Sequence, residues 1–393
     1  MQENITTEEQ ERTGERFVII GGGIAAVSAA EEIRRLLHTA SIIIISEEHA
    51  LPYDRTALSR HLILPGAGER FSLHPPEWYS LHGILLLSDR RATRLLPRLK
   101  QVELADGTVI SYDKCILATG RECIVPALEG HIPEGVFTLR TLHDLEKLAR
   151  HLRPDMRAVV LGGGPLGLES AWQLFLGGCH VTVMEENDRL LGGRLDSALT
   201  ERLIYTAAQR GVEIRTGVRV TRLGGEDRVE QVILPGEYLN ADLVLFCCGA
   251  RPRTELAVEA GLEATDGIPV NSRMMTEKYG IYACGDCARL GQEVCHSAAM
   301  AENMGRCAGK NAAGEDALYR PTPCALWLDA FGLRLFAVSD CGTGSGTYTV
   351  ERRPSGHGEA YLYRVGEHLC GAVLWNDTDE AVNLIAQLSH AGG

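Results

Sequence analysis

One loop pattern occurs twice in this chain, and it constrains the fold more than any other feature. Residues 17–30 read FVIIGGGIAAVSAA, and residues 158–171 read AVVLGGGPLGLESA. Each copy passes from a short β-rich run through a glycine turn into a helix-like stretch, which is the context that a G-x-G-x-x-G/A motif needs. The two copies therefore predict two α/β units, each able to hold a dinucleotide at a strand–turn–helix.

The small residues of each copy have different physical tasks. The first glycine allows a tight turn, the second lets the main chain approach a pyrophosphate, and the third small residue packs the helix against its strand. The phosphates then lie at the helix N-terminus, where free N–H groups and the helix dipole favour anions. These positions hold Gly21, Gly23 and Ala26 in the first copy, and Gly162, Gly164 and Gly167 in the second.

An acidic pair follows each loop at the end of the next strand pattern, where an acid is expected to bind a ribose hydroxyl. The run SIIIIS is followed by Glu47 and Glu48, and the run HVTVM is followed by Glu185 and Glu186. One glycine motif alone is a weak signal, because such turns also serve structure only. Two copies with their strands and acids indicate two dinucleotides held at once, and the simplest reason is electron transfer between them.

The composition excludes several other classes of protein. The chain has 393 residues, of which 45% are hydrophobic, and a net charge of −13. The length suits two or three domains, and the negative charge argues against a general nucleic-acid binder. No run of about 18 apolar residues occurs, so no membrane span is expected. Residues 1–15 are polar, without the apolar segment of a signal peptide, and are expected to be a disordered lead-in to a cytoplasmic protein.

The twelve cysteines do not form the pattern of a disulfide framework or of a metal site. Several lie inside apolar strand-like runs, as Cys115 and Cys247 do, and a free cysteine there behaves as a small buried hydrophobe. Cys284 and Cys287 have the C-x-x-C spacing of a redox pair. They lie at a strand end, YACGDCA, so ordinary packing is the favoured interpretation, in a reducing compartment and without a metal.

Five further motifs follow in order, namely LPYDRTALSR, YDKCILATG, GARPRTEL, IYACGDCA and GEHLCGAVLWNDT. With the glycine loops, they resemble the FAD- and NAD(P)H-dependent reductases of the pyridine nucleotide-disulfide (glutathione-reductase-like) superfamily, over nearly the whole chain. The similar subgroup contains ferredoxin and rubredoxin reductases, the flavoprotein part of nitrite reductase and apoptosis-inducing factor.

The resemblance implies an α/β fold with two Rossmann-like, three-layer dinucleotide-binding domains and a small C-terminal α+β domain. The strand and hairpin patterns suggest the domain boundaries. One hairpin, with its turn at Asp106–Gly107, is expected within the first domain. The expected parts are an FAD-binding domain at 16–120 and 249–315, an NAD(H)-binding domain at 121–248, and a C-terminal interface domain at 316–393.

The resemblance also assigns the residues that bind FAD. They are Gly21, Gly23, Ala26, Glu47, Glu48, Arg55, Thr119, Gly120 and Asp286. Glu47, or else Glu48, would hold the adenosine ribose, and Arg55 would contact the phosphates. Asp286 would accept a hydrogen bond from a ribityl hydroxyl, and an N-cap role for the same residue is compatible with that.

In the second unit the three loop glycines would hold the NAD pyrophosphate, Glu185 the adenosine ribose, and Gly249 would lie along the nicotinamide. An acid at the ribose repels a 2′-phosphate, so NADH is predicted in preference to NADPH. Glu169 would lie beside the flavin, where the subgroup pairs this glutamate with a lysine. Here that position is Arg60, so an Arg60–Glu169 ion pair is predicted.

Trp327 matches an aromatic residue of the ferredoxin-reductase motif, so it would shield the flavin or line an electron exit, or else pack in the core. The segment LPYDRTALSRHLIL lacks the cysteines of the disulfide reductases and peroxidases, which disfavours a thiol mechanism. The final domain is acid-rich but has a basic group at Arg334, Arg352 and Arg353 that would suit an acidic partner.

The sequence therefore predicts an enzyme, a monomer or a homodimer, that passes electrons from NADH through FAD to a small iron redox protein. The acceptor would be rubredoxin-like, ferredoxin-like or nitrite-reductase-like. Three alternatives stay open. They are an NADH oxidase or peroxidase-like enzyme, a reductase of a small molecule, and an NADH-responsive redox sensor.

Overall fold

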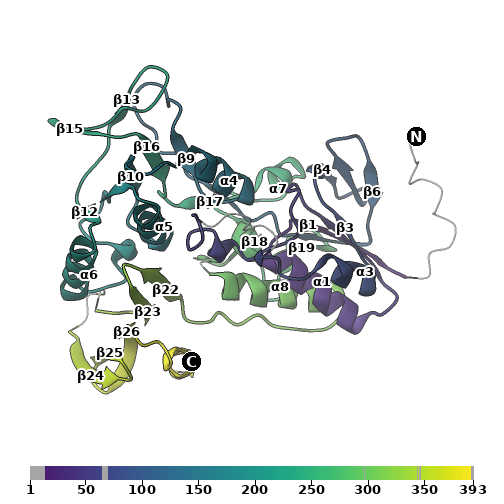
Figure 1. Ribbon diagram of the computed structural model, residues 1–393. Coiled ribbons are helices and arrows are strands. Elements are labelled where there is room, and N and C mark those ends of the chain that lie inside the picture. Colours follow the sequence, from purple (N-terminus) through teal and green to yellow (C-terminus); the bar gives the residue numbers. More distant parts are fainter. Residues whose placement is uncertain (1–13, 64–69, 296, 343, 345–346, 391–393) are drawn as a thin grey trace. The chain divides into compact units, whose positions relative to one another are not determined.

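The computed structural model describes residues 14–63, 70–295, 297–342, 344 and 347–390. The chain forms two compact units, which are described separately (Figure 1). Unit 1 consists of Met1–Asp54, Gly68–Glu122 and Arg251–Pro321, and unit 2 of Arg55–Ala67, Cys123–Ala250 and Thr322–Gly393. Most of the lead-in expected at residues 1–15 lies outside the described residues.

A five-stranded parallel sheet forms the centre of unit 1, in the order β19-β7-β1-β2-β3. The middle strand, β1, is buried over nearly its whole length, because parallel strands are covered by other elements on both faces. The strands are β1 (Arg16–Ile20), β2 (Ser41–Ile45), β3 (Ile84–Leu87), β7 (Lys114–Leu117) and β19 (Ile281–Ala283).

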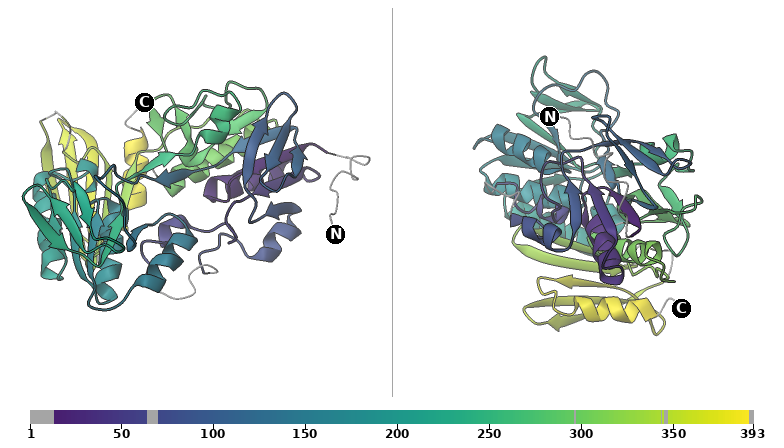
Figure 2. Two further views of the ribbon diagram at one scale, coloured as in Figure 1. Left: turned by 90° about the horizontal axis from the view of Figure 1, so that it is seen from above. Right: turned by 90° about the vertical axis from the view of Figure 1, so that its right-hand side faces the viewer.

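Helices α1 (Ile24–Leu36) and α8 (Ala298–Ala312) pack side by side against this sheet (Figures 1 and 2). Two glycines of α8, Gly305 and Gly309, lie one turn apart on the face toward α1. A Cβ on either glycine would overlap backbone atoms of α1. The sequence GRCAG therefore allows two helix backbones to approach closely, which brings the start of α1 near the strand ends.

Gly305→Ala is expected to destabilise the protein, although alanine is the better helix former. Helix propensity alone would raise the free energy of unfolding by up to about 1 kcal/mol, whereas overpacking a close contact costs about 1–3 kcal/mol. The added Cβ would meet the backbone of Ala25, which cannot rotate away as a side chain can. Urea unfolding of the purified variant checks this, and an unchanged or raised free energy of unfolding would contradict it.

A three-stranded antiparallel sheet, β4-β5-β6, is inserted between β3 and β7. The hairpin predicted across Asp106–Gly107 is confirmed between β5 and β6, where the Gly107 N–H donates to the Leu104 carbonyl at 3.0 Å. The other elements of unit 1 are α3 (Pro76–Leu81), β4 (Ala92–Leu96), β5 (Gln101–Leu104), β6 (Val109–Ser111), α7 (Glu255–Glu259), β18 (Ile268–Val270), the 3-10 helix η4 (Gly285–Cys287), β20 (Ala288–Leu290) and β21 (Glu293–Val294).

Unit 2 also contains a five-stranded parallel sheet, in the order β12-β11-β10-β16-β9. A second antiparallel sheet, β13-β14-β15, follows β12 along the chain. The strands are β9 (Val136–Thr138), β10 (Arg157–Leu161), β11 (His180–Met184), β12 (Glu213–Arg215), β13 (Arg222–Gly224), β14 (Gln231–Leu234), β15 (Glu237–Asn240) and β16 (Leu243–Phe246), and the helices are α4 (Leu142–His151), α5 (Pro165–Leu176), η3 (Leu191–Gly193) and α6 (Ser197–Gln209).

The C-terminal part of unit 2 is an antiparallel sheet, β22-β23-β26-β25-β24, with α9 on one face (Figure 2). Apolar residues of α9, such as Leu384 and Leu388, pack on buried residues of this sheet. The bounds are β22 (Ala325–Ala330), β23 (Leu333–Ser339), β24 (Thr349–Ser355), β25 (Gly358–Val365), β26 (His368–Trp375) and α9 (Ala381–His390).

The fold class expected from the sequence is confirmed, but the C-terminal sheet does not stand apart as a third compact unit. It clusters with the second parallel sheet, because α5 packs against β22 and polar contacts join α6 to β25. Tyr363 donates to Asp196 at 2.8 Å, and Arg202 donates to the hydroxyl of Tyr361 at 2.7 Å. The paired strands β8 (Arg121–Cys123) and β17 (Ala250–Pro252) lie at two of the five points where the chain passes from one unit to the other.

The motif LPYDRTALSR forms the 3-10 helix η2 (Arg55–Ala57), which is followed by turns. Within the described part of the chain, none of the helices has the length and apolar character needed to cross a bilayer.

Candidate dinucleotide sites

The first glycine loop joins β1 to α1 in unit 1. The Gly21 N–H donates to the Ile45 carbonyl at 2.8 Å, which fixes the loop to the end of β2. Gly21 has φ +129°, and a Cβ there would overlap the Ala118 carbonyl. Only glycine fits this combination of backbone conformation and close approach. Gly23, the N-cap of α1, faces open space, since no atom lies within 4 Å of a Cβ built on it.

The second loop has the same construction between β10 and α5 in unit 2. The Gly162 N–H donates to the Met184 carbonyl at 2.7 Å, Gly162 has φ +114°, and its Cβ would overlap the Cys247 carbonyl. A Cβ on Gly167 would overlap the Gly162 carbonyl, whereas Gly164, the N-cap of α5, again faces open space.

These features fit bound phosphates in both units. Each loop ends on a glycine N-cap, so the first-turn N–H groups of α1 and α5 begin at a position without a cap side chain. Open space at that position leaves room for an anion, and the helix dipole favours one there. The residues present therefore fit two dinucleotides. In the described part of the chain, no cluster of three or more His, Cys, Asp or Glu residues could hold a metal ion.

Glu185 lies directly beside the second loop. Its Oε2 accepts a hydrogen bond from the Gly163 N–H at 2.7 Å, and its Oε1 accepts from the N–H and the side-chain amide of Asn187 at 2.9 and 2.7 Å. The carboxylate is thereby held against the open end of the loop, where a ribose would lie. Glu186 instead pairs with Arg219 at 3.6 Å and is largely exposed.

The corresponding acid of unit 1, Glu47, forms an ion pair with Arg253, which sequence reasoning did not single out. Its neighbour Glu48 accepts a hydrogen bond from the Tyr53 hydroxyl at 2.8 Å. Thr119, another residue expected to bind FAD, lies near the same arginine, because its hydroxyl donates to the Arg253 carbonyl at 2.7 Å. Arg253 stands inside the motif GARPRTEL, where a second arginine and a glutamate lie two residues away, so the local sequence does not single it out.

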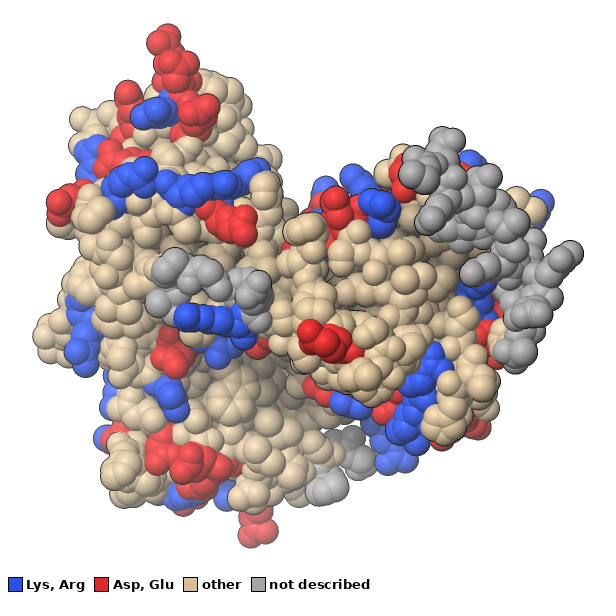
Figure 3. Space-filling view, turned by 45° about the vertical axis from the view of Figure 1, so that its right-hand side comes forward, with Lys and Arg blue, Asp and Glu red and all other residues tan. Residues whose placement is uncertain are grey.

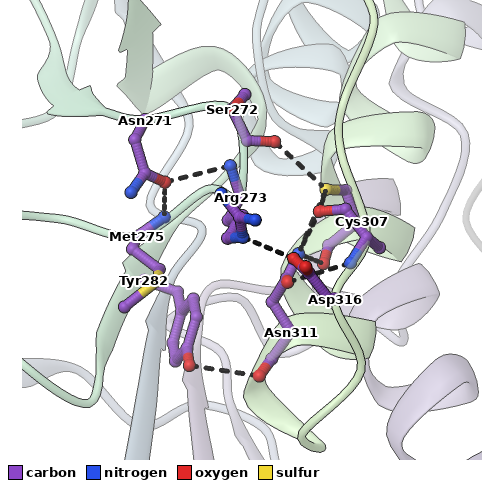
Figure 4. A network of polar contacts seen from close by, with 9 residues as sticks. Asn271, Ser272, Arg273, Met275, Tyr282, Cys307, Asn311 and Asp316 are labelled. Atoms are coloured by element: carbon purple, nitrogen blue, oxygen red, sulfur yellow. Dashed lines mark hydrogen bonds and ion pairs between the residues drawn. The ribbon is translucent and has the colours of Figure 1, made fainter.

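Asp286 lies in η4, directly after β19. Figure 4 shows a polar network beside β19, in which the Tyr282 hydroxyl of that strand donates to the Asn311 carbonyl at 3.2 Å, and Arg273 pairs with Asp316 at 2.5 Å. The N-cap interpretation of Asp286 is wrong, because Cys284 is the N-cap residue of η4. The predicted contact of Asp286 with FAD stays a prediction.

The C-x-x-C pair is buried rather than exposed for redox chemistry. Cys284 and Cys287 are fully buried, and burial raises the pKa of both thiols. The Cys287 thiol donates to the carbonyls of Leu117 and Cys284, each at 3.4 Å. All twelve cysteines of the chain are free thiols. The geometry accordingly favours packing, as the sequence indicated.

Glu169 lies on α5, and its carboxylate is buried. It accepts hydrogen bonds from the Ser59 hydroxyl and, at 3.2 Å, from the Asp329 N–H. Burial raises the pKa of Glu169, while the Ser59 hydrogen bond, the Asp329 N–H and the charge of Arg60 oppose that rise. A buried carboxyl with an altered proton affinity is typical of functional sites.

The predicted Arg60–Glu169 ion pair is corrected by the structure. Arg60 is exposed, and its guanidinium donates to the carbonyl and the hydroxyl of Thr56, at 3.1 and 2.6 Å. The physical reason is local, because the turns that follow η2 bring Thr56 within reach of the guanidinium. The preceding residue, Ser59, turns inward and takes the place beside Glu169.

Three other candidates are placed individually. Trp327 lies on β22 and is 51% exposed, with its ring 4.7 Å from that of Phe336, so it is not a core residue. Arg55 donates to the Arg140 carbonyl at 3.1 Å, and Gly249 accepts from the Ile124 N–H at 3.0 Å. Arg55, Glu169 and Trp327 belong to unit 2, whereas the first glycine loop belongs to unit 1, so their predicted flavin contacts stay predictions.

The fold and the two loops define a class of α/β oxidoreductases with two dinucleotide sites in one chain. The pyridine nucleotide-disulphide oxidoreductase family matches residues 15–305, and the chain belongs to this family. The superfamily expected from the sequence motifs is thereby confirmed.

Several of its relatives are named as reductases of small iron proteins. The ferredoxin–NAD(+) reductase subunit of the benzene 1,2-dioxygenase system of Pseudomonas putida is 32% identical over 384 residues, which are 95% of this chain and 92% of the relative. Rubredoxin-NAD(+) reductase of Pseudomonas putida is 34% identical over 275 residues, 69% of this chain and 71% of the relative. The solved covalent putidaredoxin reductase–putidaredoxin complex matches with a TM-score of 0.85 and 28% identity, over 97% of this chain and 94% of that chain.

Proposed function

We propose that this protein is an NADH-dependent FAD reductase that passes electrons to a small iron redox protein, such as a ferredoxin or a rubredoxin. The observation that carries the proposal is the matched geometry of the two glycine loops, because one chain thereby offers two phosphate cradles. Bound FAD would supply the redox chemistry, namely acceptance of a hydride from NADH and release of its electrons one at a time. The protein supplies binding, orientation and electrostatics for that chemistry.

Each unit has a distinct task in this proposal. Unit 1 holds FAD through the loop at Gly21 and the acid at Glu47, and unit 2 holds NADH through the loop at Gly162 and the acid at Glu185. Glu169 is a buried carboxyl of unit 2, and its proposed task is to respond to the charge that changes during hydride transfer. The proposal is supported by relatives that are named ferredoxin- and rubredoxin-NAD(+) reductases and resemble the chain over most of its length.

The acceptor is proposed from these relatives rather than from a basic docking patch. Acidic and basic side chains lie among one another on the face shown in Figure 3. Each of the three arginines expected to form a basic patch in the C-terminal part pairs with an acid, which lies on a neighbouring strand or on the segment before α9. The pairs are Arg334 with Asp329 at 3.6 Å, Arg352 with Glu359, and Arg353 with Glu380 at 2.5 Å.

NADH consumption by the FAD-loaded protein in air, with and without added ferredoxin or rubredoxin, tests the proposed function. Rapid oxidation that requires the iron protein is the expected result. Rapid oxidation without it would instead indicate an oxidase. Slow oxidation in both cases, with a long-lived charge-transfer band, would indicate a redox sensor, and rapid oxidation that requires an added small-molecule acceptor would indicate a small-molecule reductase.

Glu185→Gln is expected to raise the ratio of kcat/KM for NADPH to kcat/KM for NADH about tenfold, which corresponds to roughly 1.4 kcal/mol. Glutamine keeps an oxygen that can accept from Gly163, but it removes the charge that repels a 2′-phosphate. Steady-state kinetics with both coenzymes give the ratio. Glu186→Gln is the matched control, because that side chain is 69% exposed and pairs with Arg219 instead of the loop. An equal change in both variants would show that Glu185 does not select the coenzyme.

A further inference from the structure

Arg253 connects three segments of unit 1 that are far apart in the sequence. Its N–H donates to the Gly120 carbonyl at 2.9 Å, and its carbonyl accepts from the Thr119 hydroxyl at 2.7 Å. Its guanidinium forms an ion pair with Glu47, which lies just beyond the end of β2. The backbone of Arg253 is thus fixed on one side, and its charge is presented on the other.

The pair leaves Glu47 able to bind a further group. The Arg253 Nη1 contacts Oε1 of Glu47, and Oε2 is not used in that contact. An ionised carboxylate has about four lone-pair positions on its two oxygens, so one arginine contact does not saturate it. The two side chains are 32% and 39% exposed, which leaves them accessible to a ligand at the end of the parallel sheet.

The positive charge of Arg253 lies where the negative charges of Glu47 and of the proposed pyrophosphate would come together. The proposed ligand carries a pyrophosphate with two negative charges, and Glu47 adds another negative charge at the same end of the sheet. An arginine paired with that carboxylate offsets the repulsion and orients the acid toward the ribose. A guanidinium does this without losing its proton at any working pH.

We propose that Arg253 is a cofactor-positioning residue, which pairs with Oε1 of Glu47, leaves Oε2 for the adenosine ribose of FAD and slows FAD dissociation. The inference rests on the proposed binding of FAD in unit 1. It adds to that proposal a residue from the segment that returns to unit 1 after β17, more than 200 positions after Glu47. The adenosine end of the site is then closed by an ion pair between two distant segments.

The chain contains a matched control two residues earlier. Arg251 also forms an ion pair in unit 1, with Glu122 at 2.5 Å, and its side chain is 70% exposed. Arg251→Gln removes the same charge from the same segment but leaves Glu47 and its partner intact. Arg253→Gln removes the pair with Glu47, and the backbone bonds to Thr119 and Gly120 do not depend on the side chain.

The test measures release of FAD rather than turnover. Wild type, Arg253→Gln and Arg251→Gln are reconstituted with FAD and diluted, and the rise of free-FAD fluorescence gives the dissociation rate at low and at high salt. Arg253→Gln is expected to release FAD about three- to tenfold faster than wild type, as expected for loss of one charged hydrogen bond. Arg251→Gln is expected to match wild type. Salt should accelerate release from wild type more than from Arg253→Gln, because salt screens the ion pair.

A double-mutant cycle separates positioning from a general loss of stability. Glu47→Gln and Arg253→Gln are expected to be non-additive in the dissociation rate, because each removes the same pair. If Arg253→Gln does not fold, Arg253→Lys keeps the charge without the planar fork and is expected to release FAD at an intermediate rate. A release rate of Arg253→Gln equal to that of Arg251→Gln, or additive effects in the cycle, would overturn the inference. A wild-type protein that retains no FAD would instead overturn the proposed function itself.

Discussion

Gly162→Ala is expected to abolish NADH binding and to lower the free energy of unfolding by about 3 kcal/mol. Two effects combine at this residue. Gly162 has φ +114°, which is strained for any residue with a Cβ, and that Cβ would overlap the Cys247 carbonyl. The obstacle is the backbone directly after the neighbouring strand β16, so the strain cannot be relieved by a rotamer change. Thermal or urea unfolding and equilibrium titration with NADH measure the two effects.

Gly164→Ala is the control, because it separates binding from stability. Gly164 has φ −78°, and no atom lies within 4 Å of a Cβ built on it, so the apoprotein should be as stable as wild type. The same methyl group would stand where the pyrophosphate is proposed to approach the start of α5, so NADH binding should still weaken markedly. If Gly164→Ala bound NADH normally, the cofactor would not lie across this turn.

Glu169→Gln is expected to slow the reduction of bound FAD by NADH about a hundredfold. Glutamine keeps the size of the side chain and can accept from Ser59, but it removes the negative charge and the proton-binding group. Stopped-flow reduction at saturating NADH measures the rate, and Glu201→Gln, an exposed carboxyl on α6, is the control. A Glu169→Gln variant that reduces FAD at the wild-type rate would remove Glu169 from the proposed site.

The pH dependence of the free energy of unfolding, compared between wild type and Glu169→Gln, tests the buried carboxyl independently of catalysis. The pKa of Glu169 lies above its ordinary value of 4.5, mainly because of burial. The folded protein therefore holds this proton more tightly than the unfolded chain, and ionisation costs stability as pH rises from 4.5 through the raised pKa. Glu169→Gln avoids that cost. The free energy of unfolding of the variant, relative to wild type, should increase over this window and level off above it.

Local sequence patterns predicted the parallel sheets and glycine loops because the required residues are close in the chain. The conformation at Gly21 and the N-cap position of Gly23 depend on a strand and a helix that adjoin in sequence. The hairpin at Asp106–Gly107 was predictable for the same reason. Glu185 was singled out by its spacing from the loop, and in the structure it accepts a hydrogen bond from the Gly163 N–H.

Side-chain partners across long separations could not be predicted in the same way. Arg60 was expected to contact Glu169, but a turn of the backbone at Ser59 decides which of two adjacent side chains faces inward. The partner of Glu47 is 206 positions away, and nothing in the local pattern at Arg253 indicates it. The C-terminal sheet likewise joins unit 2 through contacts of α5 with β22 and of α6 with β25, which no local pattern encodes.

The sequence by itself therefore determined the family, the two Rossmann-like sheets and the glycines and acids that follow their strands. These features depend on hydrophobic periodicity and on backbone conformations that few residue types can adopt. Only the tertiary structure decided that Ser59, rather than Arg60, contacts Glu169, and that Arg253 pairs with Glu47. Such contacts depend on the direction of individual side chains after distant segments have packed, and that direction is set by the whole fold.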